Sequence, residues 1–384
     1  MGFLDTSLVG FLKCYGGLPF LFVLSIVVFF HELGHFLVAR WCGVRVLVFS
    51  IGFGPELAGF NDRHGTRWKI AAIPLGGYVK FLGDENAASV PDQAALARMS
   101  EAERQESFPH QRVSARAAIV AAGPIANFIL AITIFAGVFM LQGRPTATAR
   151  VDSIQPESAA AAAGFQPGDL VVAIDGRQVK SFNEMQRIVS TSAGRALSIT
   201  VDRGGERITL KAVPALRESK DAFGNVQRIG ILGITRAMGP EDQNVERLSP
   251  IPAVIAGVEE TWFVIERTLS YIGGVIVGRE AADQLGGPIR IAEVSCQVAT
   301  LGFTPLLYLA AILSVSIGLL NLFPVPLLDG GHLLFYAIEV LRGRPLSERA
   351  QEYGFRVGLA LVLMLMVFAT YQDILSIVRR IAAS

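Results

Sequence analysis

The chain has 384 residues, of which 52% are hydrophobic and 17% are charged, and its mean hydropathy is +0.47. This excess of apolar residues indicates a membrane protein with a water-soluble part and excludes a single water-soluble globular domain. Because 34 Lys and Arg residues balance 33 Asp and Glu residues, the net charge of +1 gives no sign of a nucleic-acid partner. The lipid bilayer is therefore the partner that the composition predicts.

The first predicted membrane span, residues 18–39, carries three ionisable residues: His31, Glu32 and His35. Asp, Lys or Arg at the centre of a membrane helix costs on the order of 2.5–3.5 kcal/mol, so we interpret such residues as functional. The two histidines of this HExxH pattern lie one turn apart on one helix face, where they can bind one zinc ion. Zinc lowers the pKa of a bound water to about 7, and Glu32 is placed to accept its proton. The alternative is a set of polar residues packed between helices.

Residues 40–116 are polar on average, except for an apolar stretch at residues 68–83. Residues 74–77, Pro-Leu-Gly-Gly, predict a turn between two β-prone runs and hence a hairpin. It is either a surface hairpin with one buried face or a hairpin that enters the membrane beside the zinc site. The second predicted span is residues 117–141. We interpret its GPIAN sequence, residues 123–127, as a packing and kink motif rather than a catalytic one.

Residues 142–240 change character and predict an α+β domain outside the membrane. A small-residue helix is followed by a Gly-Phe-Gln-Pro-Gly-Asp turn, a strand, an amphipathic helix and two paired strands at residues 197–202 and 207–213. This order resembles one PDZ domain, with no second copy. Residues 251–277, within a segment at 241–304, are apolar but interrupted by four charged residues, which favours an interfacial amphipathic helix over a span.

Residues 305–384 contain two further predicted spans, at 305–323 and from about 357 to 371. The third runs into Pro324 and Pro326, which cannot continue a helix, so we expect Asp329 to lie on a non-helical segment near membrane depth. A zinc site needs a third protein ligand, and Asp329 is the best candidate, with His332 and Cys42 as alternatives. Asp329 could instead simply form a turn before two glycines.

Four parts follow from this reading: 1–141 with the first two spans, 142–240 as the PDZ-like domain, 241–304 as the interfacial segment, and 305–384 with the last two spans. Arginines in the loop between spans three and four, and basic residues in the connection 40–116, predict that both are cytoplasmic. The PDZ-like domain is then extracytoplasmic.

Five features together resemble the site-two protease family of intramembrane zinc metalloproteases: HELGH, PLGGYVKF, GPIAN, one PDZ-like insert and NLFPVPLLDGGH. Within that family, the chain looks most like the bacterial regulator-of-sigma-E proteases. The resemblance implies an α-helical polytopic protein of the bacterial inner membrane, with about four transmembrane helices, a membrane-associated β-hairpin and one inserted α+β PDZ-like domain. It implies Zn²⁺ as cofactor, and these site residues: zinc ligands His31, His35 and Asp329, catalytic base Glu32, and substrate-binding residues Asn321, Gly76, Gly77 and Tyr78.

The resemblance also implies a function, namely regulated intramembrane proteolysis of single-span membrane proteins such as anti-sigma factors or signal-peptide remnants. Enterobacterial relatives carry two tandem PDZ domains, whereas one is expected here. The alternative function is a non-catalytic zinc-binding membrane scaffold that recruits partners through its PDZ-like domain. Zinc content and proteolysis of a Glu32→Gln variant distinguish the two.

Overall fold

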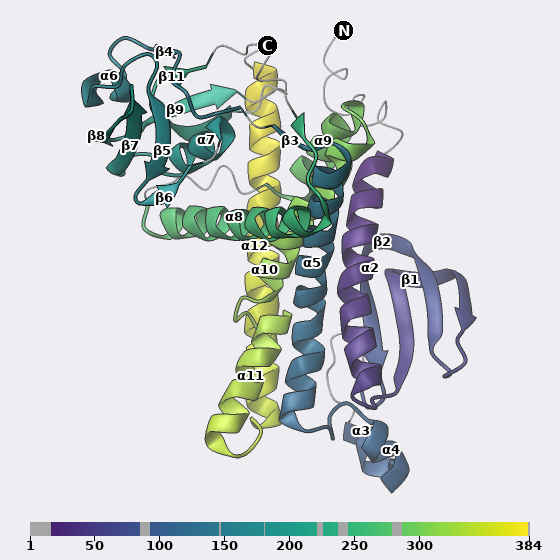
Figure 1. The fold of residues 1–384 in the computed structure, drawn as a ribbon. Coiled ribbons are helices and arrows are strands. Elements are labelled where there is room, and N and C mark those ends of the chain that lie inside the picture. The colour runs from purple at the N-terminus through teal and green to yellow at the C-terminus, as the bar shows by residue number, and fades with distance from the viewer. Residues whose placement is uncertain are drawn as a thin grey trace. The chain divides into compact units, whose positions relative to one another are not determined.

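The computed structural model describes residues 17–84, 93–145, 147–179, 181–220, 226–236, 245–278 and 286–382. The chain forms two compact units (Figure 1). The first comprises Met1–Phe135, Gly257–Thr268 and Ala281–Ser384, and the second comprises Ala136–Ala256 and Leu269–Glu280. Four helices are long and apolar enough to cross a membrane: Leu18–Trp41, Val113–Leu141, Phe303–Asn321 and Arg349–Val378. The prediction of a multi-pass helical protein with an inserted domain is therefore confirmed.

The first unit is built on the helices α2 (Leu18–Trp41), α5 (Val113–Leu141) and α10 (Phe303–Asn321). Small residues let α2 and α5 approach closely, since a Cβ on Gly34 would lie 2.3 Å from the carbonyl oxygen of Ala122. On the other side of α5, a Cβ on Gly318 of α10 would lie 3.1 Å from the Cβ of Asn127. Close approach through small residues is the usual way in which helices pack in lipid. The other helices of this unit are α3 (Gln93–Arg98), α4 (Glu101–Glu106), α9 (Pro288–Thr300), α11 (Asp329–Arg342) and α12 (Glu348–Ala382).

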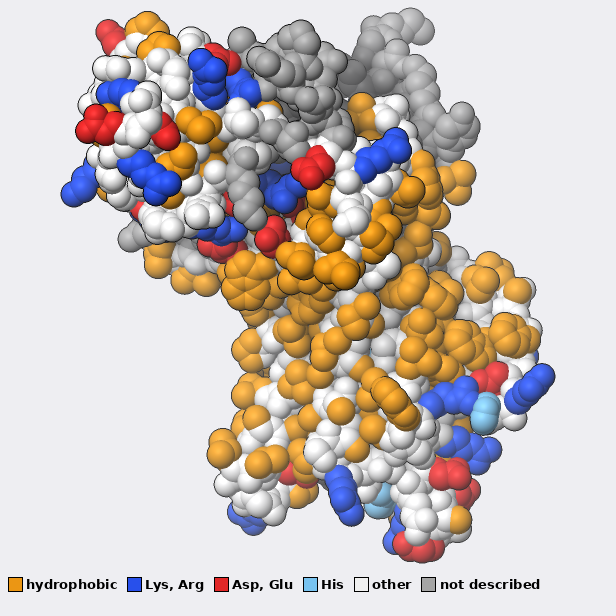
Figure 2. Space-filling view, viewed as in Figure 1, with side chains coloured by type: hydrophobic (Ala, Val, Ile, Leu, Met, Phe, Trp, Pro, Cys, Tyr) orange, Lys and Arg blue, Asp and Glu red, His pale blue; other side chains and the backbone are white. Residues whose placement is uncertain are grey.

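Helix α12 is longer than the predicted fourth span, and apolar side chains such as Val357, Met364 and Val367 are exposed along it. A helix with apolar side chains on its outer surface is expected where lipid is the solvent. Figure 2 shows hydrophobic side chains over the middle of the helical unit and charged side chains gathered at its lower end.

A β-hairpin is present, as predicted, and it lies against α2, but its strand pairing differs from the prediction. Strand β1 (Val46–Asn61) pairs antiparallel with β2 (Arg67–Phe81), and the connecting turn is at 62–66 rather than 74–77. The two apolar runs predicted to pair with each other are two halves of β2. Both pair with Val48–Ile51, one half through residues 67–70 and the other through 77–80. The hairpin therefore folds back on itself. The carboxylate of Asp62 fixes the real turn by accepting the N–H groups of His64 and Thr66.

Helix α10 ends at Asn321, before the two prolines, as their chemistry requires. The prediction that Asp329 is non-helical is wrong, because Asp329 is the first residue of α11. Two glycines allow this helix to start in close contact with the proline loop, residues 322–328 between α10 and α11. A Cβ on Gly330 would lie 2.3 Å from the carbonyl oxygens of Leu322 and Phe323, and one on Gly331 would meet the Val325 carbonyl at the same distance.

The second unit has an α+β core that agrees with the predicted domain. Its four-stranded antiparallel sheet has the order β6-β5-β7-β8, and residues such as Val151, Ile199 and Val201 are fully buried beside it. The predicted paired strands are β7 (Leu197–Arg203) and β8 (Glu206–Ala212). The remaining elements are β3 (Arg144–Pro145), β4 (Ser153–Ile154), α6 (Ala159–Ala163), β5 (Leu170–Ile174), β6 (Arg177–Gln178), α7 (Phe182–Ser190), β9 (Ala215–Lys220), β10 (Val226–Ile231), β11 (Ile234–Thr235) and β12 (Val245–Glu246). The predicted interfacial segment is the helix α8 (Pro250–Ile276), which belongs partly to each unit.

Candidate metal centre

Three side chains from two distant parts of the sequence converge on one point. The Nε2 atoms of His31 and His35 are 3.3 Å apart, and Asp329 Oδ2 lies 3.2 Å from the first and 3.5 Å from the second. A tetrahedral zinc ion with bonds of about 2.0–2.2 Å separates its ligand atoms by about 3.3–3.6 Å. The three observed separations therefore fit a zinc ion bound to these three atoms.

The chemistry of the donor set agrees with this fit. Asp329 Oδ2 is buried and accepts no hydrogen bond from the residues that the structure describes. Two imidazole nitrogens lie beside it, and each can offer a lone pair to a metal ion when the proton of its ring is on the other nitrogen. A cation at the centre satisfies all three atoms. These residues are the candidate metal site.

Helix α5 supports both histidines from behind. His35 Nδ1 lies 2.8 Å from the carbonyl oxygen of Ile119, and His31 Nδ1 lies 3.2 Å from the side-chain amide of Asn127. Between these two contacts lies Gly123, where a Cβ would be 2.3 Å from His35 Nε2 and 2.9 Å from His31 Cε1. The GPIAN sequence was interpreted as a packing motif. It does pack closely, but two of its residues also lie at the histidines: Gly123 lies against both rings and Asn127 lies at His31 Nδ1. The periodicity of the sequence alone could not reveal these contacts.

Glu32 lies between the three converging residues and strand β2, and it is close to both. It interacts electrostatically with His31, His35 and Asp329, and its carboxylate accepts a hydrogen bond from the backbone N–H of Val79. The strand can come this close because residue 77 is glycine. A Cβ there would meet the Cγ of Glu32 at 3.0 Å and the carbonyl oxygen of Ser50 at 2.8 Å.

The structure also places the four residues that were predicted to bind substrate. Asn321 lies at the site, with its side-chain amide 3.4 Å from His31 Nε2. Gly76 packs against the ring of Phe53, and Tyr78 pairs with Ser50 while its ring stacks on Phe53 at 6.0 Å between centroids. Gly76, Gly77 and Tyr78 therefore lie on the stretch of β2 that approaches Glu32.

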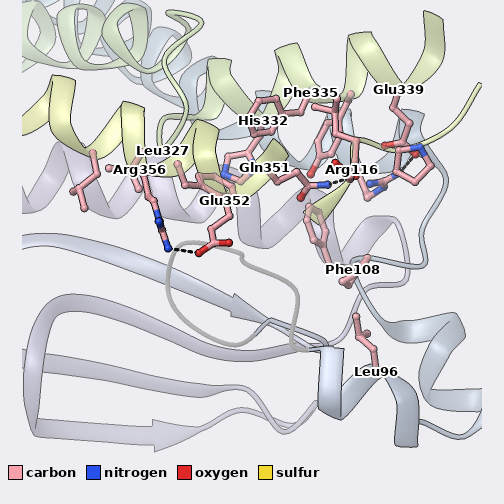
Figure 3. Close-up of a pocket in the computed structure, with 17 residues that line it drawn as sticks. Leu96, Phe108, Arg116, Leu327, His332, Phe335, Glu339, Gln351, Glu352 and Arg356 are labelled. Atoms are coloured by element: carbon pink, nitrogen blue, oxygen red, sulfur yellow. Dashed lines mark hydrogen bonds and ion pairs between the residues drawn. The ribbon is translucent and has the colours of Figure 1, made fainter. Parts of the chain in front are cut away.

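Cys42 and His332, the two alternative third ligands, are not part of the metal-binding group that the described residues form. Cys42 follows the last residue of α2. His332, one turn after Asp329 on α11, instead lines a cavity of about 800 Å³ between α5, α11 and α12, and Figure 3 shows its ring beside Leu327 and Phe335. The sequence reading that favoured Asp329 over both is consistent with this geometry.

Sequence reasoning missed an ion pair that ties α11 to α5. Arg116 at the start of α5 binds Glu339 at 2.7 Å, and both side chains are only 15% exposed. The same guanidinium lies 4.8 Å from the ring centroid of Tyr336. Helix α11 carries Asp329, the candidate third ligand, at its first residue, so this contact ties the helix of that residue to α5. A Tyr and a Glu at i and i+3 are a weak sequence signal, because their partner lies 220 residues or more away in the sequence.

Comparison with known proteins agrees with the site. The sequence model of peptidase family M50 matches residues 19–365. A protein of Agrobacterium fabrum, whose name describes it as a putative zinc metalloprotease, is 54% identical over 369 residues that cover 96% of this chain and 98% of its own. The metalloprotease MmpA of Caulobacter vibrioides is 42% identical, with 96% of each chain covered. The regulator of sigma-E protease RseP of Escherichia coli is 32% identical over 451 aligned positions, with 92% of this chain and 97% of its own covered.

Proposed function

Because this chain belongs to peptidase family M50 and is a zinc metalloprotease, we propose that it cleaves peptide bonds within or near the membrane-spanning segment of single-span proteins. The observation that carries this proposal is the convergence of His31, His35 and Asp329, with Glu32 beside them. Both histidines and Glu32 lie on α2, a helix long and apolar enough to cross a membrane, and Asp329 begins the helix that follows α10, another such helix. An ordinary soluble protease has no need for its metal ligands at that depth, because charged groups there are costly.

His31, His35 and Asp329 would hold the zinc ion, which when bound supplies a Lewis acid for the scissile carbonyl and a water acidic enough to attack it at neutral pH. Glu32 acts as the general base and then carries the proton to the leaving amine. Its carboxylate is held in place by the N–H of Val79, so it needs little reorientation to reach a group beside the metal.

Strand β2 would hold the substrate. A helical segment hides its carbonyl groups in its own hydrogen bonds, so it must become extended before it can be cleaved. If the substrate pairs as an added β-strand with the stretch Gly76–Tyr78, backbone hydrogen bonds would keep it extended close to Glu32. Asn321, whose amide lies beside His31 Nε2, would donate a hydrogen bond to the substrate near the scissile bond.

The substrate class and the location rest on the relatives and on charge distribution. RseP is named a regulator of sigma-E protease, and a role in regulating a sigma factor favours anti-sigma factors as substrates. Signal-peptide remnants as substrates and the bacterial inner membrane as the location follow from the family resemblance. Basic residues in the connection 40–116, and Arg342, Arg344 and Arg349 around the turn from α11 to α12, support a cytoplasmic side for both, and an extracytoplasmic side for the inserted domain. Helix α8, with exposed Ile251, Ile255 and Trp262, would lie in the membrane interface.

No described residue of the inserted domain belongs to the candidate metal centre, so we assign this domain to substrate access. It would act as a gate that excludes substrates whose external domain has not been trimmed. Replacing residues 146–213 with a short Gly/Ser bridge should then permit cleavage of untrimmed substrate. Slower cleavage of trimmed substrate, with untrimmed substrate left intact, would instead identify a recruiting role through strand addition.

The function is tested with purified protein in vesicles that also contain a single-span reporter. Glu32→Gln should retain zinc and lose cleavage by about 10²–10⁴-fold, because a general base contributes about that much. The matched control is Glu352→Gln, the same change at a surface ion pair with Arg356 on α12. It should cleave at the wild-type rate. Near-normal cleavage by Glu32→Gln would contradict the proposed role of Glu32, and zinc retention without any cleavage by wild type would favour the scaffold alternative.

A further inference from the structure

Asn127 is a fully buried polar residue in α5, and the proposed chemistry gives it no role. Its side-chain nitrogen lies 3.2 Å from His31 Nδ1, while its side-chain oxygen is buried and accepts no hydrogen bond from the described residues. A buried amide oxygen without a partner costs about 1–3 kcal/mol, so its position needs an explanation.

The metal supplies the explanation through the position of one proton. A neutral imidazole carries a single N–H, so a histidine that binds a metal through Nε2 must carry its proton on Nδ1. For His35 the arrangement is already suitable, because the carbonyl oxygen of Ile119 lies 2.8 Å from Nδ1 and accepts that proton. For His31 the acceptor must come from Asn127, which provides the described side-chain contact to Nδ1.

We propose that Asn127 is a positioning residue for the metal centre: its side-chain oxygen accepts the Nδ1–H of His31 and so keeps His31 Nε2 free for the metal. The inference rests on the proposed function. The amide reaches this state by exchanging its oxygen and nitrogen, which have nearly the same shape. This exchange costs Asn127 Oδ1 no hydrogen bond, because that oxygen accepts none from the residues that the structure describes. The amide can also serve the metal-free protein, where its nitrogen donates to an unprotonated Nδ1.

The surroundings of Asn127 hold its backbone and Cβ in place for this role. Its carbonyl oxygen accepts a hydrogen bond of 2.9 Å from Ser314 Oγ on α10, and Gly318 of the same helix leaves only enough room for the Cβ. Three helices therefore meet at this residue: α2 brings His31, α5 brings the amide, and α10 anchors it. Groups that orient metal-binding histidines in this way change metal affinity by about 10–100-fold when they are removed.

The test measures zinc affinity of the full-length protein in detergent by competition with a chelator, independently of proteolysis. Asn127→Leu keeps the volume and removes the acceptor, and Asn127→Ala, measured beside it, removes the acceptor without bulk. Both should bind zinc about 10–100-fold more weakly than wild type. Asn127→Asp, which presents an acceptor in either orientation, should bind zinc within about threefold of wild type or more tightly. The control Ser314→Ala removes a buried hydrogen bond to the same residue but none to His31, and it should keep wild-type affinity.

Two results would overturn the inference: wild-type zinc affinity in both Asn127→Leu and Asn127→Ala, or an equal loss in Asn127→Asp, which would show that only the packing of the amide matters. Neither result touches the proposed protease activity, which fails instead if wild type binds no zinc or if Glu32→Gln cleaves normally.

Discussion

Gly123 of α5 offers the sharpest test of how the metal centre is held, through the single change Gly123→Ala. The added methyl group would lie 2.3 Å from His35 Nε2, 2.5 Å from His35 Cε1 and 2.9 Å from His31 Cε1. Two carbon atoms in ordinary contact are about 3.5–4.0 Å apart. The ring of His35 must therefore move by about 1 Å or more, unless the two helices separate.

Metal sites tolerate deviations of only about 0.2 Å in bond length. A displacement of about 1 Å removes His35 as a ligand, and we expect zinc affinity to fall by at least about 100-fold. Overpacking of the helix contact should also lower the free energy of unfolding by about 1–3 kcal/mol.

The assay is zinc competition in detergent, with thermal unfolding of the same samples. The matched control is Gly137→Ala, the same substitution on the same helix, where a Cβ would meet no atom within 4 Å. It should keep wild-type zinc affinity and, because alanine is the better helix former, wild-type or higher stability. Wild-type zinc affinity in Gly123→Ala would refute the close packing of α5 on the two histidines.

Three further predictions concern other parts of the chain. Gly77→Ala should slow cleavage by about 10-fold or more with zinc retained, because its Cβ would push β2 away from Glu32, and unchanged kinetics would contradict the role of that strand. Arg116→Met should lower the free energy of unfolding by about 3–5 kcal/mol by leaving Glu339 unpaired, and most of this loss should be recovered when Glu339 is also changed to Met. Burial opposes ionisation of Asp169, but hydrogen bonds from an arginine and a backbone N–H hold the pKa of this carboxyl below its usual value. Its stabilisation is therefore present above about pH 4 and is lost as pH falls through the lowered pKa. The amide protection factors of the inserted domain, which are exchange rates corrected for their intrinsic pH dependence, should fall in acid for wild type and depend less on pH in Asp169→Asn.

The sequence was most informative where chemistry is local. HExxH places two ligands on one face of a helix with no information beyond the helical repeat, and hydropathy alone locates the spans. The third ligand required one physical step, from two prolines to a broken span and from there to a carboxylate that needs a partner. This step pointed to Asp329, which the structure brings beside His31 and His35, even though the expected local structure was wrong.

Residue pairs that meet only through the tertiary fold could not be predicted. Strand β1 was overlooked because Gly52, Gly54 and Pro55 interrupt its pattern, and without it the two halves of β2 had no partner except each other. Helix α11 was hidden by its opening Asp-Gly-Gly, which favours a turn until the proline loop is known to pack against the two glycines. Asn127 looked like a packing residue because its histidine partner is 96 positions away in the sequence.

The central claim, zinc held by His31, His35 and Asp329, is tested most directly by zinc-edge X-ray absorption on wild type and on Asp329→Ala. Wild type should contain one zinc ion per chain, surrounded by nitrogen and oxygen at about 2.0–2.2 Å, and Asp329→Ala should lose most of its zinc. A sulfur ligand at about 2.3 Å would instead identify Cys42, and full zinc retention in Asp329→Ala would contradict the assignment of Asp329 as a ligand.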